Sequence, residues 1–120
     1  MCGRYNISDM PGLQALLDHL GINVKLPSPC YNIAPTEDVL LLRDGAGEYA
    51  RWWLPPSWAP EISTKYSMFN ARSETLAKSK AFQRPFKSQR GIVPMSSFIE
   101  GRTEAVVKTP WLITNESGAL

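Results

Sequence analysis

The sequence predicts an α+β fold in which a mostly antiparallel β-sheet carries a few flanking helices. Residues 13–20 space their leucines along one face of a helix. Several short apolar runs between residues 39 and 114 are separated by turn residues, as in an antiparallel sheet. At 120 residues, the chain has the length of one domain with one core. We therefore expect residues 1–120 to form a single domain.

The composition is that of a soluble globular protein, with 43% hydrophobic and 20% charged residues. No apolar run approaches the roughly 20 residues of a membrane span, and the N-terminus does not resemble an export signal. We expect a cytoplasmic protein with no membrane partner. The two cysteines are then expected to stay reduced, with Cys30 as a small buried hydrophobe. The single histidine, His19, has no companion ligands, so neither a metal nor a cofactor is expected.

The first predicted helix starts at Ser8 or Asp9, either of which can cap free amides, and ends at Gly21. Pro11 is tolerated in its first turn. Its buried face is predicted to consist of Leu13, Leu16, Leu17 and Leu20. His19 lies in the last turn, where the helix C-terminus favours it without a catalytic role.

The middle of the chain contains a proline-rich loop and a β-hairpin. Prolines at 27, 29 and 35 exclude a helix or a central strand, so residues 31–36 are predicted to form a surface path. Residues 39–42 and 49–53 flank a turn at 44–47 and predict the hairpin. Trp52 and Trp53 are expected in the core. Trp58, between prolines, is a candidate exposed aromatic on which a base could stack.

The second half predicts a short strand at 67–70, a helix from Ser73 to about residue 81, and strands at 91–95 and 97–99. Glu100 follows closely, and residues 104–108 and 111–114 offer one or two more strands. Asn70 and Arg72 fall where a strand end meets a helix start, a place where side chains and free amides can converge on an anion.

Charge is unevenly distributed along the chain. The net charge is only +2. Between residues 65 and 102, however, eight lysines and arginines face only two glutamates, Glu74 and Glu100. Two interpretations stay open here, a contact surface for a polyanion and an ordinary solvated surface.

The N-terminal cysteine could undergo a reaction that is not open to any interior residue. Removal of Met1 would leave a thiol and a primary amine on Cys2, and such an aminothiol condenses with aldehydes to a thiazolidine ring. The small cysteine side chain suits initiator-methionine removal. An α-amine with a pKa of about 8 is partly neutral at physiological pH, so it can attack a carbonyl. The alternative is that Cys2 is an ordinary small apolar residue.

Five ordered blocks resemble the SOS-response-associated peptidase (SRAP) family. They are residues 1–5 (MCGRY), 31–36 (YNIAPT), 51–59 (RWWLPPSWA), 70–75 (NARSET) and 94–101 (PMSSFIEG). The resemblance covers essentially the whole chain but only the N-terminal portion of the family domain. It implies a barrel-like β-sheet core, left incomplete here.

The resemblance further implies an abasic-site shield in single-stranded DNA, which forms a covalent thiazolidine crosslink through Cys2. Asn70 would orient the cysteine and the sugar, and Glu100 would manage protons during imine formation, for which a carboxylate of raised pKa is suited. Arg4 and Arg72 would bind phosphates, and Pro35 and Trp58 would meet the DNA at the lesion. The implied catalytic residues are thus Cys2, Asn70 and Glu100, and the implied DNA-binding residues are Arg4, Pro35, Trp58 and Arg72.

The sequence also departs from the family pattern. Trp53 and Pro55 replace a glycine and an isoleucine, and Gly101 replaces the aromatic that follows the glutamate. The family's histidine, in a His-x-Arg-Met-Pro segment of the C-terminal half, has no match here. The chain is therefore interpreted as a truncated or prophage-type relative, or as a fragment that needs a second copy or the missing C-terminal half as partner. Two other functions stay open: a hydrolase or autopeptidase with Cys2 as N-terminal nucleophile, and a non-catalytic remnant that binds single-stranded DNA.

Overall fold

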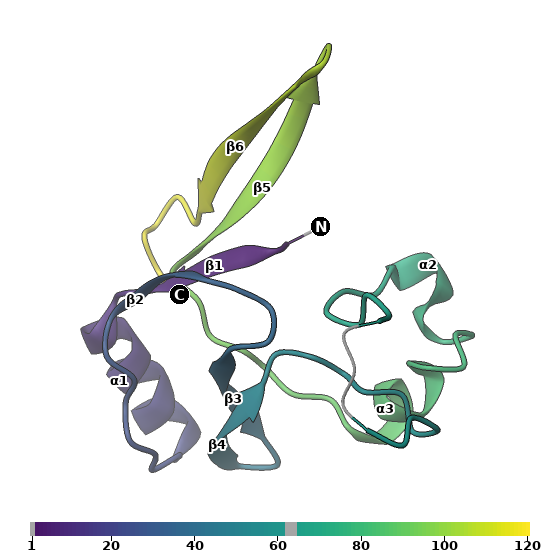
Figure 1. Cartoon of the computed structure of the whole chain (residues 1–120). Helices are drawn as coiled ribbons and strands as arrows, with labels where there is room; N and C mark the ends of the chain where they lie inside the picture. The colour runs from purple at the N-terminus through teal and green to yellow at the C-terminus, as the bar shows by residue number, and fades with distance from the viewer. Residues whose placement is uncertain (1, 62–64) are drawn as a thin grey trace.

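In the computed structural model, residues 2–61 and 65–120 are described, and they form an α+β fold of antiparallel sheets and short helices (Figure 1). In chain order the elements are β1 (Arg4–Ile7), α1 (Met10–Leu20), β2 (Cys30–Ile33), β3 (Asp38–Arg43), β4 (Ala46–Arg51), α2 (Ser73–Leu76), α3 (Gln83–Ser88), β5 (Ser97–Glu104) and β6 (Val107–Thr114).

The larger sheet has the strand order β2-β1-β5-β6, with every pair antiparallel. Tyr5 on β1 lies opposite Ile33 on one side and Phe98 on the other. The proline-flanked segment predicted as a surface path therefore includes an edge strand, which is where prolines can border a sheet. The remaining described strands, β3 and β4, form a separate sheet. The predicted α+β fold of antiparallel strands with a few helices is confirmed, but the two sheets of the described residues remain separate and form no closed barrel.

The predicted first helix is confirmed as α1. The Asp9 side chain accepts a hydrogen bond of 2.9 Å from the Gly12 amide, and Gly21 ends the helix with a left-handed φ of 66°. Leu13 and Leu17 are fully buried, whereas Leu20 was wrongly placed on the buried face, because it is 46% exposed. The chain reverses at Gly21 and buries the following residue, Ile22, instead.

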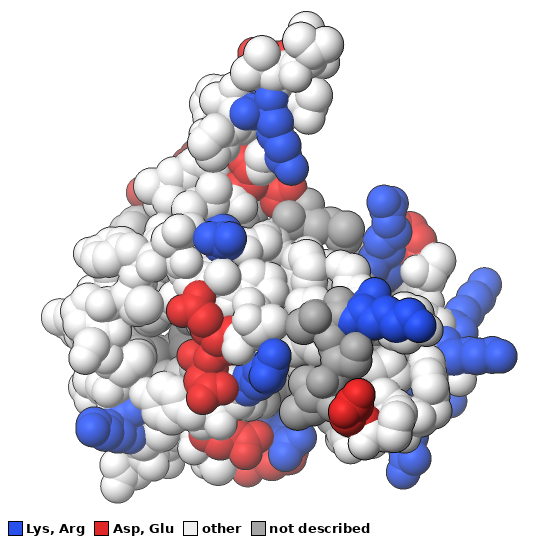
Figure 2. All heavy atoms as spheres, in the orientation of Figure 1, with Lys and Arg blue, Asp and Glu red and all other residues white. Residues whose placement is uncertain are grey.

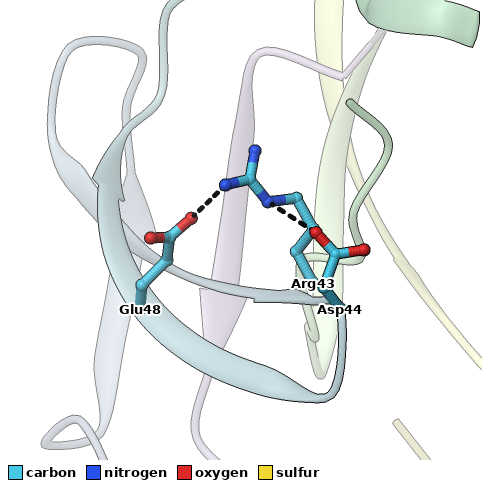
Figure 3. A network of polar contacts seen from close by, with 3 residues as sticks. All are labelled: Arg43, Asp44 and Glu48. Carbon is cyan, nitrogen blue, oxygen red and sulfur yellow. Dashed lines mark ion pairs between the residues drawn. The ribbon is translucent and has the colours of Figure 1, made fainter. Parts of the chain in front are cut away.

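The predicted β-hairpin is confirmed as β3 and β4, which pair from Asp38 opposite Arg51 to Arg43 opposite Ala46. Asp44 and Gly45 turn the chain with φ values of 53° and 76°, a conformation that Gly and Asp tolerate. Arg43 reaches Asp44 at 3.5 Å and Glu48 at 3.6 Å across this turn (Figure 3). Such exposed ion pairs contribute little, so the buried apolar residues of β3 are the main support of the hairpin.

The segment from residue 65 to residue 95 was predicted least well. Residues 67–70 form no strand, although Met68 accepts one backbone bond of 3.0 Å from Leu54. The helix predicted from Ser73 stops at Leu76, and a second helix, α3, follows after a series of turns. In 91–95, a single bridge joins Ile92 to Leu42 in place of a strand. These stretches lack a regular apolar spacing, so isolated bonds and turns hold them rather than a sheet.

Cys30 is exposed, so its prediction as a buried hydrophobe was wrong. It opens the edge strand β2, of which only Ile33 is buried. The strands β5 and β6 form an arm that extends away from the rest of the structure (Figure 1). Every residue of β6 is exposed. No helix in the described ranges has the length and apolar character needed to cross a membrane.

Candidate functional site

Cys2 is half-buried and lies two residues before the start of β1, a strand with neighbours on both sides. The Asn70 Nδ2 atom donates a hydrogen bond of 2.7 Å to the Cys2 carbonyl oxygen. The Cys2 thiol donates to the Arg4 carbonyl oxygen at 3.4 Å. Both the main chain and the side chain of Cys2 are therefore held in place. Met1, whose removal the aminothiol chemistry would require, lies outside the described residues.

Glu100 lies on β5, within electrostatic range of the Cys2 thiol. Burial raises the pKa of this thiol, a backbone hydrogen bond with Arg4 opposes that rise, and the Glu100 carboxylate adds to it. Glu100 was predicted just behind a strand, but it lies inside β5, opposite Trp111. Because β5 pairs with β1, the structure brings Cys2, Asn70 and Glu100 together from three distant parts of the chain.

Aromatic side chains fix the segment that carries Asn70. The Trp52 indole donates a hydrogen bond of 3.2 Å to the Phe69 carbonyl oxygen. The Trp52 ring lies edge-on to Tyr5, with centroids 5.5 Å apart. Tyr5 itself is buried in β1, three residues after Cys2. These contacts connect Cys2 through β1 and Trp52 to Asn70, so both ends of the Asn70 to Cys2 bond are anchored.

Beside Asn70 lies an open, mainly apolar cavity of about 340 Å³. Its lining includes Trp53, Phe69 and Phe82. The Trp53 and Phe69 rings are 5.7 Å apart at 36°. Trp52 and Trp53 were predicted as core residues, yet both are only half-buried. The buried Trp53 Nε1 atom has no hydrogen-bond partner among the described residues.

A second open hollow, of about 440 Å³, lies where β1, β5 and β6 meet. It is lined by Gly3, Arg4, Ile99, Glu100, Gly101, Lys108 and Pro110. Arg4 opens β1 and is exposed, and its Nη1 atom lies 3.4 Å from Asn32 Oδ1. A hollow bordered by exposed cationic side chains and backbone can take an anionic chain from solvent. Below we call this hollow the β1–β5–β6 groove.

The other predicted site residues lie in separate loops and turns. Arg72 is exposed at the N-terminus of α2. Trp58 is 59% exposed, which confirms its prediction as an exposed aromatic. Pro35 is half-buried beside Thr36, whose φ of 81° is rare for a β-branched residue. Among the described residues, no hydrogen bond or ring contact joins these three residues to Cys2.

Basic side chains gather around α2 and α3. Figure 2 shows lysine and arginine atoms projecting on the side of the molecule where Figure 1 places these helices. The exposed cations of this segment are Lys65, Arg72, Lys78, Lys80, Arg84, Lys87 and Arg90. The basic half of the sequence is therefore largely one region of the structure.

A structural role for Asn6 was not predicted from the sequence. It is buried at 8% exposure, accepts a bond of 2.7 Å from the Asn32 amide and donates a bond of 2.8 Å to Ser97 Oγ. Asn6 therefore joins β1 to both neighbouring strands. The available signal was a single amide between the apolar Tyr5 and Ile7 in a short strand.

Cys2 and Cys30 are both free thiols. In the two described ranges, no three histidine, cysteine, aspartate or glutamate side chains group as metal ligands would. His19 is exposed in the last turn of α1. The chemically useful groups near Cys2 are therefore a carboxylate, an amide and exposed cations.

Comparison with known proteins gives a consistent result. A family profile described as "SOS response associated peptidase (SRAP)" matches residues 1–120. The abasic site processing protein YoaM of Bacillus subtilis is 36% identical over 129 aligned positions, which cover all of this chain and 56% of that protein. The abasic site processing protein YoqW of Bacillus phage SPbeta is 34% identical over 129 positions, covering all of this chain and 57% of YoqW. The chain thus spans a little over half the length of these relatives.

A crystal structure of a protein from Bacteroides thetaiotaomicron superposes with a TM-score of 0.80 at 19% sequence identity. The match covers 96% of this chain and 55% of that protein. At this identity the likeness concerns the fold alone.

Proposed function

The chain belongs to the SOS response-associated peptidase (SRAP) family, and from that premise we propose that it captures abasic sites in single-stranded DNA through Cys2. The observation that carries the proposal is the convergence on Cys2 of an amide and a carboxylate. Asn70 donates to the Cys2 carbonyl at 2.7 Å, and Glu100 acts electrostatically on the Cys2 thiol.

The proposed reaction needs Cys2 at the start of the chain, after hydrolytic removal of Met1. The α-amine adds to the C1′ aldehyde of the ring-opened abasic sugar to give a carbinolamine. Loss of water then gives an imine, and the thiol adds to the imine carbon to close a thiazolidine. Aldehyde and aminothiol become thiazolidine and one water, so no oxidant or reductant is required.

Glu100 is proposed to move the protons of this sequence. Collapse of the carbinolamine requires protonation of its departing hydroxyl, and ring closure requires removal of the thiol proton. A half-buried carboxylate close to the thiol suits both transfers. Burial and, to a smaller extent, Glu100 raise the pKa of this thiol, so a nearby base that accepts its proton would assist ring closure.

The DNA strand is proposed to lie across the exposed cations and aromatics around this site. Arg4 and Arg72 would contact phosphates, which hold a strand without reading its sequence. Trp58 offers an exposed ring for base stacking, and Pro35 an apolar wedge. This surface would favour single strands over intact duplex.

The test is incubation with a single-stranded oligonucleotide containing one abasic site, followed by a denaturing gel. Wild-type protein is expected to form a retarded adduct, and Cys2→Ala is expected to form none. Cys30→Ser is the matched control, because it removes the other free thiol and should leave adduct formation intact. Equal adduct formation by wild type and Cys2→Ala would rule the proposal out.

An alternative is a hydrolase in which the Cys2 amine serves as base for its own thiol. The word peptidase in the family description favours it. Turnover of peptide or amide substrates by trimmed protein, without any aldehyde, would identify this activity.

The other alternative is a non-catalytic module that binds single-stranded DNA. Retention of Met1, seen in the mass of the intact protein, would favour this alternative.

The relatives are longer than this chain, so we also propose a partner for the exposed strand β6. Its eight residues are all exposed, and no described strand pairs with its outer edge. A segment equivalent to the rest of the relatives, or a second copy of the chain, would extend the sheet there. Sedimentation of the purified protein distinguishes a monomer from a self-associating chain.

A further inference from the structure

We propose that Lys108 is a second phosphate-binding cation, which together with Arg4 holds the DNA backbone in the β1–β5–β6 groove. This inference rests on the proposed function, because it requires DNA as the ligand. It adds a residue outside the five sequence blocks that resemble the family. It also names the face of the sheet along which the strand runs.

The position of Lys108 follows from the register of the arm. Lys108 on β6 lies opposite Thr103 on β5, and Gly101 is the diagonal neighbour, opposite Pro110. Arg4 on β1 lies opposite Ile99 on β5. Ile99, Gly101 and Thr103 share one face of β5, because side chains alternate along a strand. Arg4 and Lys108 are therefore on the same face of the sheet, and both line the groove.

The glycine at position 101 makes room for the lysine. A Cβ atom built on Gly101 would collide with the Lys108 Cε atom and lie 3.2 Å from Lys108 Nζ. The lysine side chain thus extends from β6 over Gly101 on β5 rather than pointing away from the arm. Here, where the resemblance leads us to expect a large aromatic, the chain has a glycine with a cation lying over it.

The charge of Lys108 is available to a ligand. Arg102, a cation of the same arm, is paired with Glu104 at 3.2 Å. Lys108 forms no ion pair or side-chain hydrogen bond with any described residue, and it is exposed. Two unequal cations, one guanidinium and one ammonium, therefore border the groove with no carboxylate bound to Lys108.

A phosphodiester strand fits these features better than a carboxylate ligand or a peptide does. The groove is open and about 440 Å³, room for a chain that passes through rather than for an enclosed small molecule. Its lining combines two cations, Arg4 and Lys108, with one carboxylate, Glu100, and otherwise consists of glycines and the apolar residues Ile99 and Pro110. The two cations offer charge to a phosphate backbone without base-specific contacts. Arg4 is two residues from Cys2, so a phosphate held there would lie close to the reactive residue.

The test uses a single-stranded oligonucleotide carrying a tetrahydrofuran in place of the abasic sugar, since it has no aldehyde and reports binding alone. The dissociation constant is measured by fluorescence anisotropy over a series of salt concentrations. Loss of one phosphate contact on a single strand reduces the slope of log K against log salt by about 0.7. Lys108→Gln is expected to show this reduction with weaker binding at low salt, and Lys108→Arg is expected to keep the wild-type slope.

Two further variants separate a specific contact from general charge loss. Lys25→Gln removes an exposed lysine outside the groove and is expected to match wild type. Gly101→Val keeps every charge but fills the space under Lys108, so it is expected to resemble Lys108→Gln. An unchanged slope in Lys108→Gln, an equal loss in Lys25→Gln, or salt-independent binding by wild type would each overturn the inference.

Failure of this inference is distinguishable from failure of the proposed function. If Lys108→Gln binds like wild type while Cys2-dependent adducts still form on a true abasic oligonucleotide, only the Lys108 contact is refuted. If adducts form equally with Cys2→Ala, the proposed capture reaction is refuted whatever the salt slopes show.

Discussion

Replacing Asn70 with alanine should slow adduct formation about two- to tenfold while leaving the protein folded. Asn70 donates a single hydrogen bond of 2.7 Å to the Cys2 carbonyl, at a half-buried position. A neutral hydrogen bond of this kind contributes about 0.5–1.5 kcal/mol net, because water replaces the lost partner. If that contribution is felt fully in the transition state, it corresponds to about a two- to tenfold change in rate.

The assay is a single-turnover time course of adduct formation with protein in excess over the abasic oligonucleotide, resolved on a denaturing gel. Thermal unfolding of each variant shows that the comparison is between folded proteins. Asn115→Ala is the matched control, because Asn115 accepts bonds of 3.1 and 3.0 Å from Ser117 in an exposed turn. A wild-type rate for folded Asn70→Ala would refute a positioning role. A loss beyond a hundredfold would mean that Asn70 contacts the reacting atoms directly.

Three further predictions follow from the described contacts. Trp53→Phe should leave the free energy of unfolding unchanged or raise it by about 1 kcal/mol, because it removes an unpaired buried donor. Trp52→Phe should lower the free energy of unfolding by about 1 kcal/mol, because the hydrogen bond to the Phe69 carbonyl is lost. Chemical denaturation that finds Trp53→Phe less stable than Trp52→Phe would contradict both expectations. Asn6→Ala should lower the free energy of unfolding by about 1–3 kcal/mol in the same assay, because one buried and one partly buried hydrogen bond are lost. In a Cys30→Ser background, Glu100→Gln should shift the pH profile of Cys2 alkylation to lower pH. The negative charge of Glu100 raises the thiol pKa, so its removal favours the thiolate. An unmoved profile would show that Glu100 does not act on the thiol.

Local sequence patterns predicted the helix and the hairpin whose ends are fixed by residues next to them in the sequence. The helix at residues 10–20 is capped by Asp9 and closed by Gly21, and the hairpin of β3 and β4 is closed by Asp44 and Gly45. In both, the residues that start or stop the element are next to it in sequence, so spacing and turn composition are sufficient.

The segment from 67 to 95 could not be predicted in this way, because distant residues hold it. The Phe69 carbonyl is fixed by the indole of Trp52, and the Ile92 backbone bonds to Leu42 across about half the chain. Burial also depends on topology. Cysteine is a residue type that is often buried, but Cys30 is exposed because β2 is an edge strand of the sheet. The strand order, which local sequence does not reveal, places β2 at the edge.

The candidate site could not be predicted from local sequence patterns either, because its assembly depends on the register between β1 and β5. Tyr5 pairs with Phe98, which places Glu100 beyond the start of β1, beside Cys2. A slip of one residue would turn Glu100 to the opposite face of the sheet and bring Ile99 or Gly101 in its place. Asn6 bonds to Ser97 in the adjacent pair and thereby resists that slip. We therefore expect this buried amide, which has no proposed role in the chemistry, to help hold the Glu100 carboxylate near the Cys2 thiol. For this reason we expect Asn6→Ala to reduce adduct formation even at temperatures where the variant remains folded.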